Sequence, residues 1–147
     1  MVCPICNAKT RSGQRCKLHT CKYAPKCHLH TPVRVGPSNI PGAGQGLFAR
    51  KDIKKNEVFG DYKVGTQELS RAQFRAKYPN GRATHVWAPR NQGPYYDASN
   101  LQKSVAGAAN RGRSNNARIN ANGKLQAKAN IRAGREITVG YGAGYRL

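Results

Sequence analysis

Apolar residues in this chain come in short runs that are separated by polar, glycine-containing turns. Residues 47–49 form one such run, and the polar turn 54–56 separates it from the next, at 58–59. Short apolar runs between turn residues are typical of buried β-strands. The pattern predicts strands at 33–35, 47–49, 58–59, 84–88, 118–119, 125–129 and 136–141. Many short strands with little helix predict a mainly β fold.

Two segments are predicted to be helical. In residues 66–78, Thr66 is a suitable N-cap, Leu69 and Phe74 provide part of an apolar face, and a proline ends the pattern. Residues 104–110 are small and rich in alanine, which predicts a short buried helix.

The chain has 147 residues, enough for one domain with a small appendage. Pro32 and Pro37 mark the passage between two parts, which predicts an N-terminal module at 1–32 and a main domain at 33–147. No apolar run is long enough to cross a membrane, and the N-terminus shows no signal-peptide pattern. We therefore expect an intracellular protein with no membrane partner.

The charge of the chain is strongly positive. Lys and Arg number 26 against 6 Asp and Glu, so the formal net charge is +20. This excess predicts attraction to polyanions such as nucleic acid. A well-solvated basic surface without a specific partner is the alternative.

All five cysteines lie within the first 27 residues. An odd, clustered set in a chain without a secretion signal indicates a metal site rather than disulfides. One tetrahedral zinc set is Cys6, Cys16, Cys27 and His30, in a C-x9-C-x10-C-x2-H spacing. The rival set replaces Cys16 with Cys3, which forms a C-x2-C pair with Cys6. Cys21, His19 and His28 are further candidate ligands.

The densest glycine pattern lies just before the apolar run 47–49, at Gly42, Gly44 and Gly46. Glycines at this density let a backbone turn tightly and approach a ligand closely. The stretch is either a ligand-facing loop that leads into a strand or an ordinary glycine-rich hairpin.

Two further segments decide between these interpretations. The motifs are Gly44-Gln-Gly-Leu-Phe-Ala49, Tyr96-Asp-Ala98 and the C-terminal stretch 127–142, which contains Glu136-Ile-Thr-Val-Gly-Tyr141-Gly142. Together they resemble the SET-domain protein lysine methyltransferases, in the family's order, from about Val33 to the C-terminus. The sequence looks most like the compact, stand-alone SET proteins of large DNA viruses, and the first cysteine set resembles a small basic module found in proteins of such viruses.

The resemblance implies a SET fold, in which the Asn110 segment and the C-terminal strand cross in a knot-like arrangement. It also implies S-adenosylmethionine as the cofactor, beside Zn²⁺ in the N-terminal module. Tyr141 would be the catalytic tyrosine that orients the lysine nitrogen, and Tyr62 would line the lysine channel, with Tyr96 as a weaker candidate. The cofactor-binding residues implied by the resemblance are Gly44, Gln45, Gly46, Leu47, His85, Asn110, Arg111 and Tyr145.

The run after Gly107 departs from the family pattern. Arg111 stands for the family's histidine, and Gly107 and Ala108 stand for its Arg-Phe pair. Asn110 and Asn116 keep their spacing. Two functions therefore remain open. One is methylation of a histone or a virus-encoded chromatin protein, and the other is a non-catalytic, basic module that binds chromatin or nucleic acid.

The net charge also bears on the substrate. A basic peptide is repelled at long range, so we expect DNA or a nucleosome to attract the basic surface and to present the substrate. Asp61 and Asp97 are expected to receive the peptide locally. No cysteine-rich tail follows Tyr141, so we expect the zinc module or a second copy of the chain, in a homodimer, to close the channel. The host nucleus, a viral factory or the virion is the expected location.

Overall fold

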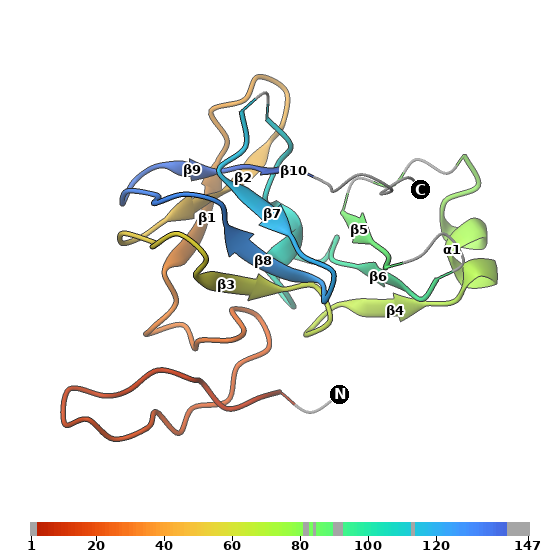
Figure 1. Ribbon diagram of the computed structural model, residues 1–147. Coiled ribbons are helices and arrows are strands. Elements are labelled where there is room, and N and C mark those ends of the chain that lie inside the picture. Colours follow the sequence, from red (N-terminus) through yellow and green to blue (C-terminus); the bar gives the residue numbers. More distant parts are fainter. Residues whose placement is uncertain (1–2, 81–82, 84, 90–92, 113, 141–147) are drawn as a thin grey trace.

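The computed structural model describes residues 3–80, 83, 85–89, 93–112 and 114–140 (Figure 1). Tyr141 and Tyr145, the two C-terminal residues with predicted roles, lie outside this range. Within the described residues the chain is mainly β, as the sequence predicts.

The strands in the described part of the chain form three small sheets. The first has the order β1 (Val33–Pro37), β2 (Gln45–Ala49), β9 (Glu136–Ile137). The second has the order β10 (Val139–Gly140), β7 (Ala117–Ile119), β8 (Lys124–Ala127), β3 (Val58–Asp61). The third has the order β4 (Gln67–Leu69), β6 (Tyr95–Asp97), β5 (Val86–Trp87). The strands β2 and β3, which follow one another in sequence, therefore belong to different sheets.

The last predicted strand, 136–141, divides at Thr138. Its first part, β9, pairs antiparallel with β2, and its second part, β10, pairs parallel with β7. Thr138 forms an isolated bridge with Asn110. The C-terminal strand therefore joins two sheets and lies against the Asn110 segment, the two segments that the resemblance expects to cross.

The predicted helix at 66–78 begins later than expected. Helix α1 spans Arg71–Lys77, and its N-cap is Ser70 rather than Thr66. The Ser70 hydroxyl accepts a hydrogen bond from the Gln73 backbone N–H, and the Gln73 side chain accepts one from the Ser70 N–H, which is a capping box. The residues before Ser70 form β4 and pair with β6, so strand pairing takes precedence over the local helical pattern.

Among the described residues, the core of the main domain contains one large cluster and a smaller one. The large cluster collects the inward-facing residues of the first two sheets and the 3₁₀ helix η1 (Ala106–Ala108). The smaller cluster lies between α1 and the third sheet and consists of Leu69, Phe74, Val86 and Tyr95. The alanine-rich segment 104–110 is buried, as predicted, but only its middle is helical.

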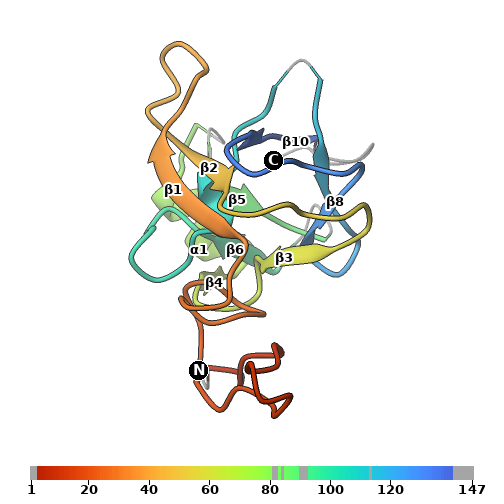
Figure 2. The ribbon, with the colours of Figure 1, turned by 90° about the vertical axis from the view of Figure 1, so that its left-hand side faces the viewer.

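Residues 3–30 form a separate lobe below the main domain (Figures 1 and 2). Residues 4–10 and 14–20 run antiparallel as a two-stranded ribbon, with bridges between Ile5 and His19 and between Lys9 and Arg15. The lobe is connected to the main domain by a hydrogen bond from the Val105 N–H to the Lys22 carbonyl, 3.0 Å long.

Among the described residues, none of the helices has the length and apolar character needed to cross a membrane.

Candidate functional site

The glycine loop is held in place by Glu136. Its carboxylate accepts hydrogen bonds from the Ser38 hydroxyl at 2.7 Å and from the Asn39 N–H at 2.8 Å. Gly46 packs directly against this carboxylate, since a Cβ on Gly46 would lie 2.7 Å from the Glu136 Oε2 atom. Gly44 has a φ of +72°, a conformation that glycine adopts without strain. The family's glycine motif therefore forms a tight, exposed turn whose position depends on the C-terminal strand.

Asn110 connects the glycine loop to the C-terminal strand. Its side-chain amide N–H donates to the Gln45 backbone carbonyl at 2.8 Å, and its own backbone carbonyl accepts from the Val139 N–H at 2.9 Å. The glycine loop, the Asn110 segment and the C-terminal strand, which are far apart in the sequence, therefore meet at one point.

Asn116 has a similar role, six residues after Asn110. Its side-chain N–H donates to the Glu136 backbone carbonyl at 3.0 Å, and its side-chain oxygen accepts from the Thr138 N–H at 3.0 Å. The two asparagines that keep the family spacing thus hold the C-terminal strand at the point where it changes sheets.

The remaining predicted cofactor residues differ in their exposure. Gly44 and Gln45 are exposed at the start of β2, and Arg111 is exposed beside Asn110. The Leu47 side chain is fully buried in the main core, so only its backbone is available to a ligand.

His85 has a structural contact. Its Nδ1 atom lies 2.7 Å from the Gly107 carbonyl, and its backbone carbonyl accepts from the Ala98 N–H at 2.8 Å. It is half-buried and connects the segment before β5 to η1, which leads into Asn110. A role next to the cofactor site stays a prediction for this residue.

The departure at Gly107 has a steric explanation. A Cβ at this position would collide with the carbonyl oxygen of Ala98 and would lie 2.9 Å from the Ala98 Cβ. The backbone of η1 therefore packs so closely on the end of β6 that this chain has no room for the arginine of the family pattern. The glycine is a packing requirement of this chain.

Gly107→Ala is expected to lower the free energy of unfolding by about 2 kcal/mol, because the colliding atoms belong to rigid backbone. Gly36→Ala is the matched control, since the nearest atom to its new Cβ is the mobile tip of the Arg34 side chain. This control should change stability by less than about 0.5 kcal/mol. Urea denaturation of both variants measures the difference, and equal effects would contradict the packing explanation.

Tyr62 and Tyr96 belong to an aromatic cluster with Trp87. The ring centroids of Tyr62 and Trp87 lie 6.5 Å apart, and those of Trp87 and Tyr96 lie 5.8 Å apart. Tyr62 is 1% exposed and Tyr96 is half-buried. Burial, with smaller effects from the charges of Glu68 and Asp61, raises the pKa of Tyr96. Sequence reasoning overlooked Trp87, although it is the only tryptophan of the chain and lies in a predicted strand.

Asp97 is not available to a substrate. It is 3% exposed, forms a 2.7 Å ion pair with Lys77, and accepts a hydrogen bond from the Tyr78 hydroxyl at 2.6 Å. Burial opposes its ionisation, but the hydrogen bonds from Lys77 and Ser99 outweigh this effect and lower the pKa of Asp97 to about 2. The expectation that Asp97 receives a basic peptide is therefore wrong, because α1 already supplies its cation.

The lowered pKa of Asp97 predicts a pH dependence of stability. Its stabilising contribution, about 2 kcal/mol for a shift of nearly two pKa units, is complete above the unfolded pKa near 4 and is lost as the pH falls towards 2. Asp97→Asn should remove most of this dependence, whereas the exposed Asp52→Asn should remove little of it. Urea denaturation between pH 2 and 5 provides the measurement, and equal effects of the two variants would contradict the assignment.

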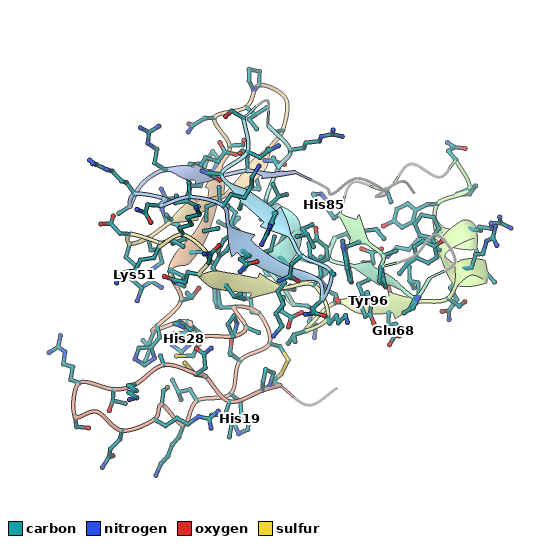
Figure 3. All side chains as sticks on the ribbon, in the orientation of Figure 1. His19, His28, Lys51, Glu68, His85 and Tyr96 are labelled. Carbon is teal, nitrogen blue, oxygen red and sulfur yellow. A yellow bond between two sulfur atoms is a disulfide. The ribbon has the colours of Figure 1, made fainter. Side chains whose placement is uncertain are left out.

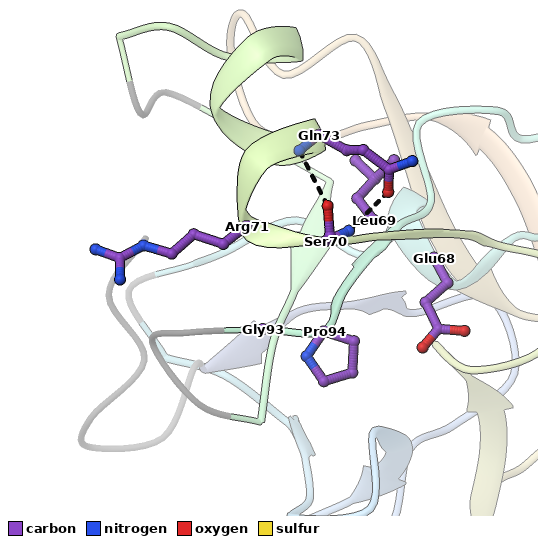
Figure 4. Close-up of a pocket in the computed structure, with 7 residues that line it drawn as sticks. All are labelled: Glu68, Leu69, Ser70, Arg71, Gln73, Gly93 and Pro94. Atoms are coloured by element: carbon purple, nitrogen blue, oxygen red, sulfur yellow. Dashed lines mark hydrogen bonds between the residues drawn. The ribbon is translucent and has the colours of Figure 1, made fainter.

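Two clefts flank helix α1. One, of about 510 Å³, lies between the start of the helix and the turn before β6 (Figure 4). Its lining residues are Glu68, Leu69, Ser70, Arg71, Gln73, Gly93 and Pro94. The other, of about 380 Å³, includes Lys77, Asp97 and Lys103 in its lining. Both clefts are next to the third sheet, away from the Asn110 junction.

In the N-terminal lobe, the structure brings together the four residues of the first zinc set. The ligand atoms of Cys6, Cys16, Cys27 and His30 all lie within 4.8 Å of one another. The His30 Nδ1 atom lies 3.7 Å from the Cys6 sulfur and 3.2 Å from the Cys27 sulfur, and the Cys16 and Cys27 sulfurs are 3.9 Å apart. Tetrahedral zinc, with Zn–S near 2.3 Å and Zn–N near 2.0 Å, requires separations of about 3.8 Å and 3.5 Å. The donor set and its spacing therefore fit a zinc ion.

The surroundings of the Cys6 thiol favour its deprotonated form by lowering its pKa. Burial opposes its ionisation, but hydrogen bonds from the Ala8 and Cys27 backbone outweigh that effect and lower the pKa of Cys6 to about 7. Thiolates are the form in which cysteine binds zinc.

Cys3 and Cys21 form a disulfide, which corrects the expectation that the cysteines bind metal without any disulfide. The ribbon explains the pairing, because Ile5 lies opposite His19 and the N–H of Thr20 donates to the carbonyl of Pro4. This register places the two cysteines opposite one another, with Cα atoms 4.9 Å apart.

The two remaining candidate ligands, His19 and His28, lie outside the metal cluster (Figure 3). The His19 Nδ1 atom lies 2.9 Å from the Cys3 carbonyl. His28 is exposed, and its backbone carbonyl accepts a hydrogen bond from Arg50.

Comparison with solved structures finds the same fold in known methyltransferases. The methyltransferase domain of human PR domain-containing protein 2 matches with a TM-score of 0.57 and 20% identity, over 82% of this chain and 83% of that domain. Polycomb repressive complex 2 of Chaetomium thermophilum, bound to S-adenosylmethionine in an autoinhibited conformation, matches with a TM-score of 0.58 and 18% identity. That match covers 78% of this chain but only 16% of the much longer Polycomb chain.

A comparison with curated proteins finds no match. A family model for the SET domain matches residues 44–142, which is about two thirds of the sequence and includes the glycine loop, Asn110 and the C-terminal strand. The chain therefore belongs to the SET-domain family.

Proposed function

We propose that this protein is an S-adenosylmethionine-dependent protein-lysine methyltransferase. One observation carries the proposal: the Asn110 side chain and backbone join the glycine loop, through Gln45, to the C-terminal strand, through Val139. These three segments carry the cofactor motifs of the family, and they meet although no local sequence pattern requires it.

The residues at this junction fit the cofactor. The turn at Gly44 and Gln45 is exposed, and apart from the two chain neighbours no atom of the described residues lies within 4 Å of the place where a Cβ on Gly44 would be, so the backbone there is open to a ligand. The Glu136 carboxylate accepts a hydrogen bond from the Asn39 N–H, and the Asn110 side chain donates one to the Gln45 carbonyl, so both residues fix the position of the turn. When bound, S-adenosylmethionine supplies the methyl group.

The chain's own residues would prepare the lysine. A lysine ammonium with a pKa near 10.4 has no lone pair and must lose its proton before it can react. Buried aromatic walls favour the neutral amine because they do not solvate the charged form. The rings of Tyr62, Trp87 and Tyr96 form such a cluster, and we propose that Tyr141 orients the nitrogen.

We also propose that the chain has two units, a zinc module at 1–32 and a SET domain at 33–147. Three cysteine sulfurs and one imidazole nitrogen are a usual donor set for structural zinc. Cys6, Cys16, Cys27 and Ala8 make up the module's own hydrophobic cluster, so the metal would replace the core that a segment this short lacks.

The second candidate function is a non-catalytic module that binds nucleic acid or chromatin. It is favoured by the exposed Arg111 in place of the family's histidine and by the net charge of +20. The packing explanation for Gly107 weakens this alternative, because close packing against Ala98 in this chain gives the departure a structural cause other than loss of the site.

Calorimetric titration with S-adenosylmethionine distinguishes the two functions. The protein should bind one cofactor per chain, and Asn110→Ala should weaken binding about 5- to 10-fold, since it removes the hydrogen bond to the glycine loop. Asn122→Ala makes the same chemical change in the exposed β7–β8 turn and should leave the affinity unchanged. A protein that binds no cofactor would be the non-catalytic module.

For the substrate, we propose a histone or a virus-encoded chromatin protein that the enzyme meets on DNA. The charge of +20 repels a free basic peptide, whereas phosphates near the peptide would offset this repulsion. Activity on nucleosomes should therefore exceed activity on free peptide at low salt, and the advantage should shrink as salt rises. Such a substrate agrees with a location in the nucleus, a viral factory or the virion. We also propose that a second copy of the chain closes the lysine channel.

A further inference from the structure

The N-terminal ribbon has one face that is exposed along its whole length. In an antiparallel pair, opposite residues and every second residue along each strand share a face. The register of Ile5 with His19 and of Lys9 with Arg15 therefore defines the two faces of the ribbon. One face carries Cys6, Ala8 and Cys16 and adjoins the metal cluster. The other face, called here the ribbon face, consists of Ile5, Asn7, Lys9, Arg15, Lys17 and His19, all of them exposed.

The ribbon face is positively charged and has no neighbouring acid. None of the six acidic residues of the chain lies in the first 32 residues, which contain six Lys and Arg. Lys26 adds its charge at the rim, because its Nζ atom donates to the Asn7 side chain at 2.8 Å. The three cations of the ribbon face therefore have no carboxylate partner within the module.

Exposed apolar side chains point to the same part of the molecule. Among the described residues, the exposed large apolar side chains are Ile5 at 42%, Leu18 at 41% and Leu29 at 61%, and all three belong to the module. Of these three, Ile5 lies on the ribbon face, directly opposite His19, whereas the register places Leu18 on the other face and Leu29 follows the ribbon in sequence. Cations combined with exposed apolar groups suit a surface that a partner covers.

We propose that the ribbon face binds duplex DNA in the major groove. The major groove is about 12 Å wide and admits a two-stranded β-ribbon. Lys9, Arg15 and Lys17 would lie near phosphates, where each cation releases counterions from the DNA. Ile5 would supply an apolar contact at the open end of the ribbon. This inference goes beyond methyl transfer, because it holds for an active or an inactive SET domain.

Hydrogen bonds between the N-terminal module and the main domain would keep DNA that is bound by the ribbon face close to the SET domain. The Lys22 carbonyl accepts from the Val105 N–H, and the His28 carbonyl accepts from the Arg50 guanidinium at 2.8 Å. Both bonds tie the module to the main domain directly. DNA held by the ribbon face would therefore keep the SET domain next to proteins that sit on that DNA.

The test uses the 147-residue chain loaded with zinc and a short DNA duplex, with binding followed by fluorescence anisotropy at several salt concentrations. Changing Lys9, Arg15 and Lys17 together to Gln should lower the slope of log affinity against log salt by about 2.7, which corresponds to three phosphate contacts. The affinity at 0.1 M salt should fall at least about tenfold. The matched control changes the exposed Lys124, Lys128 and Arg132 to Gln and should keep the slope of the parent protein.

Metal content and the cofactor titration check that each variant is folded. If the triple variant loses its metal, single changes of Lys9 or Lys17 to Gln decide, with an expected slope change of about 0.9 each. Equal slopes for the ribbon and control variants would overturn the proposal. So would equally tight, ribbon-dependent binding of the single strand or of duplex RNA, because their shapes do not offer this groove. Loss of DNA binding with intact cofactor binding separates this inference from the proposed methyl transfer.

Discussion

Tyr141→Phe is expected to lower the rate of methyl transfer at least about 100-fold while the affinity for S-adenosylmethionine stays within about twofold. In the role proposed above for Tyr141, the substitution removes one hydroxyl at the reacting centre and leaves the ring, so the loss should fall on turnover. In the sequence, Tyr141 directly follows β10 (Val139–Gly140), in which the Val139 N–H donates to the Asn110 backbone carbonyl. Single-turnover methylation of a nucleosome substrate, together with calorimetry, measures the two quantities separately.

Tyr23→Phe is the control for this experiment, because it deletes a hydroxyl from a half-buried tyrosine at the edge of the main core, in the N-terminal lobe. This variant should methylate at the parent rate. Unchanged turnover in Tyr141→Phe would mean that another group orients the lysine, and loss of cofactor binding would mean that Tyr141 acts in binding rather than in the reaction.

Removal of zinc is the second change with a large expected effect. In the described part of the N-terminal module, the hydrophobic cluster consists of three buried cysteines with the partly buried Ala8 packed against them. The proposed metal would therefore supply most of the free energy that folds the module, of the order of 10 kcal/mol. A chelator should therefore unfold the module and expose the thiols of Cys6, Cys16 and Cys27 to alkylation. Elemental analysis before treatment should give one zinc per chain.

Single cysteine variants separate the two ligand sets. Cys16→Ser should lose the metal, whereas Cys3→Ser should keep it, because Cys3 is paired with Cys21 and stands outside the cluster. The reverse result would favour the rival set, and protein without metal in the absence of chelator would exclude a zinc module.

Unfolding of the module should also weaken cofactor binding a few-fold, since it breaks the hydrogen bond between Lys22 and Val105 at the start of η1.

The sequence by itself determined the local conformations. Short apolar runs between turns predicted the strands that contain Val33, Leu47 and Val58, and the glycine and C-terminal motifs indicated the family. Their success has a local cause, because strand formation, tight turns and small buried segments depend on residues a few positions apart.

Local reasoning failed where a distant partner decided. Thr66 is a good cap, yet pairing with β6 converts residues 67–69 into a strand and moves the helix start to Ser70. In the same way, Lys77 and Tyr78 at the end of the helix form an ion pair and a hydrogen bond with Asp97, which the local sequence had predicted to contact a substrate.

Only the tertiary structure decided how the site is assembled. The spacing favoured Cys16 and left Cys3 as its rival, and the ribbon register separates them by placing Cys3 opposite Cys21. The contact of Asn110 with Gln45 spans 65 positions and that of Ser38 with Glu136 spans 98, so no local pattern contains either of them. Residues identify the chemistry that a chain can perform, whereas long-range pairing determines which of them meet, because it depends on the packing of the whole core.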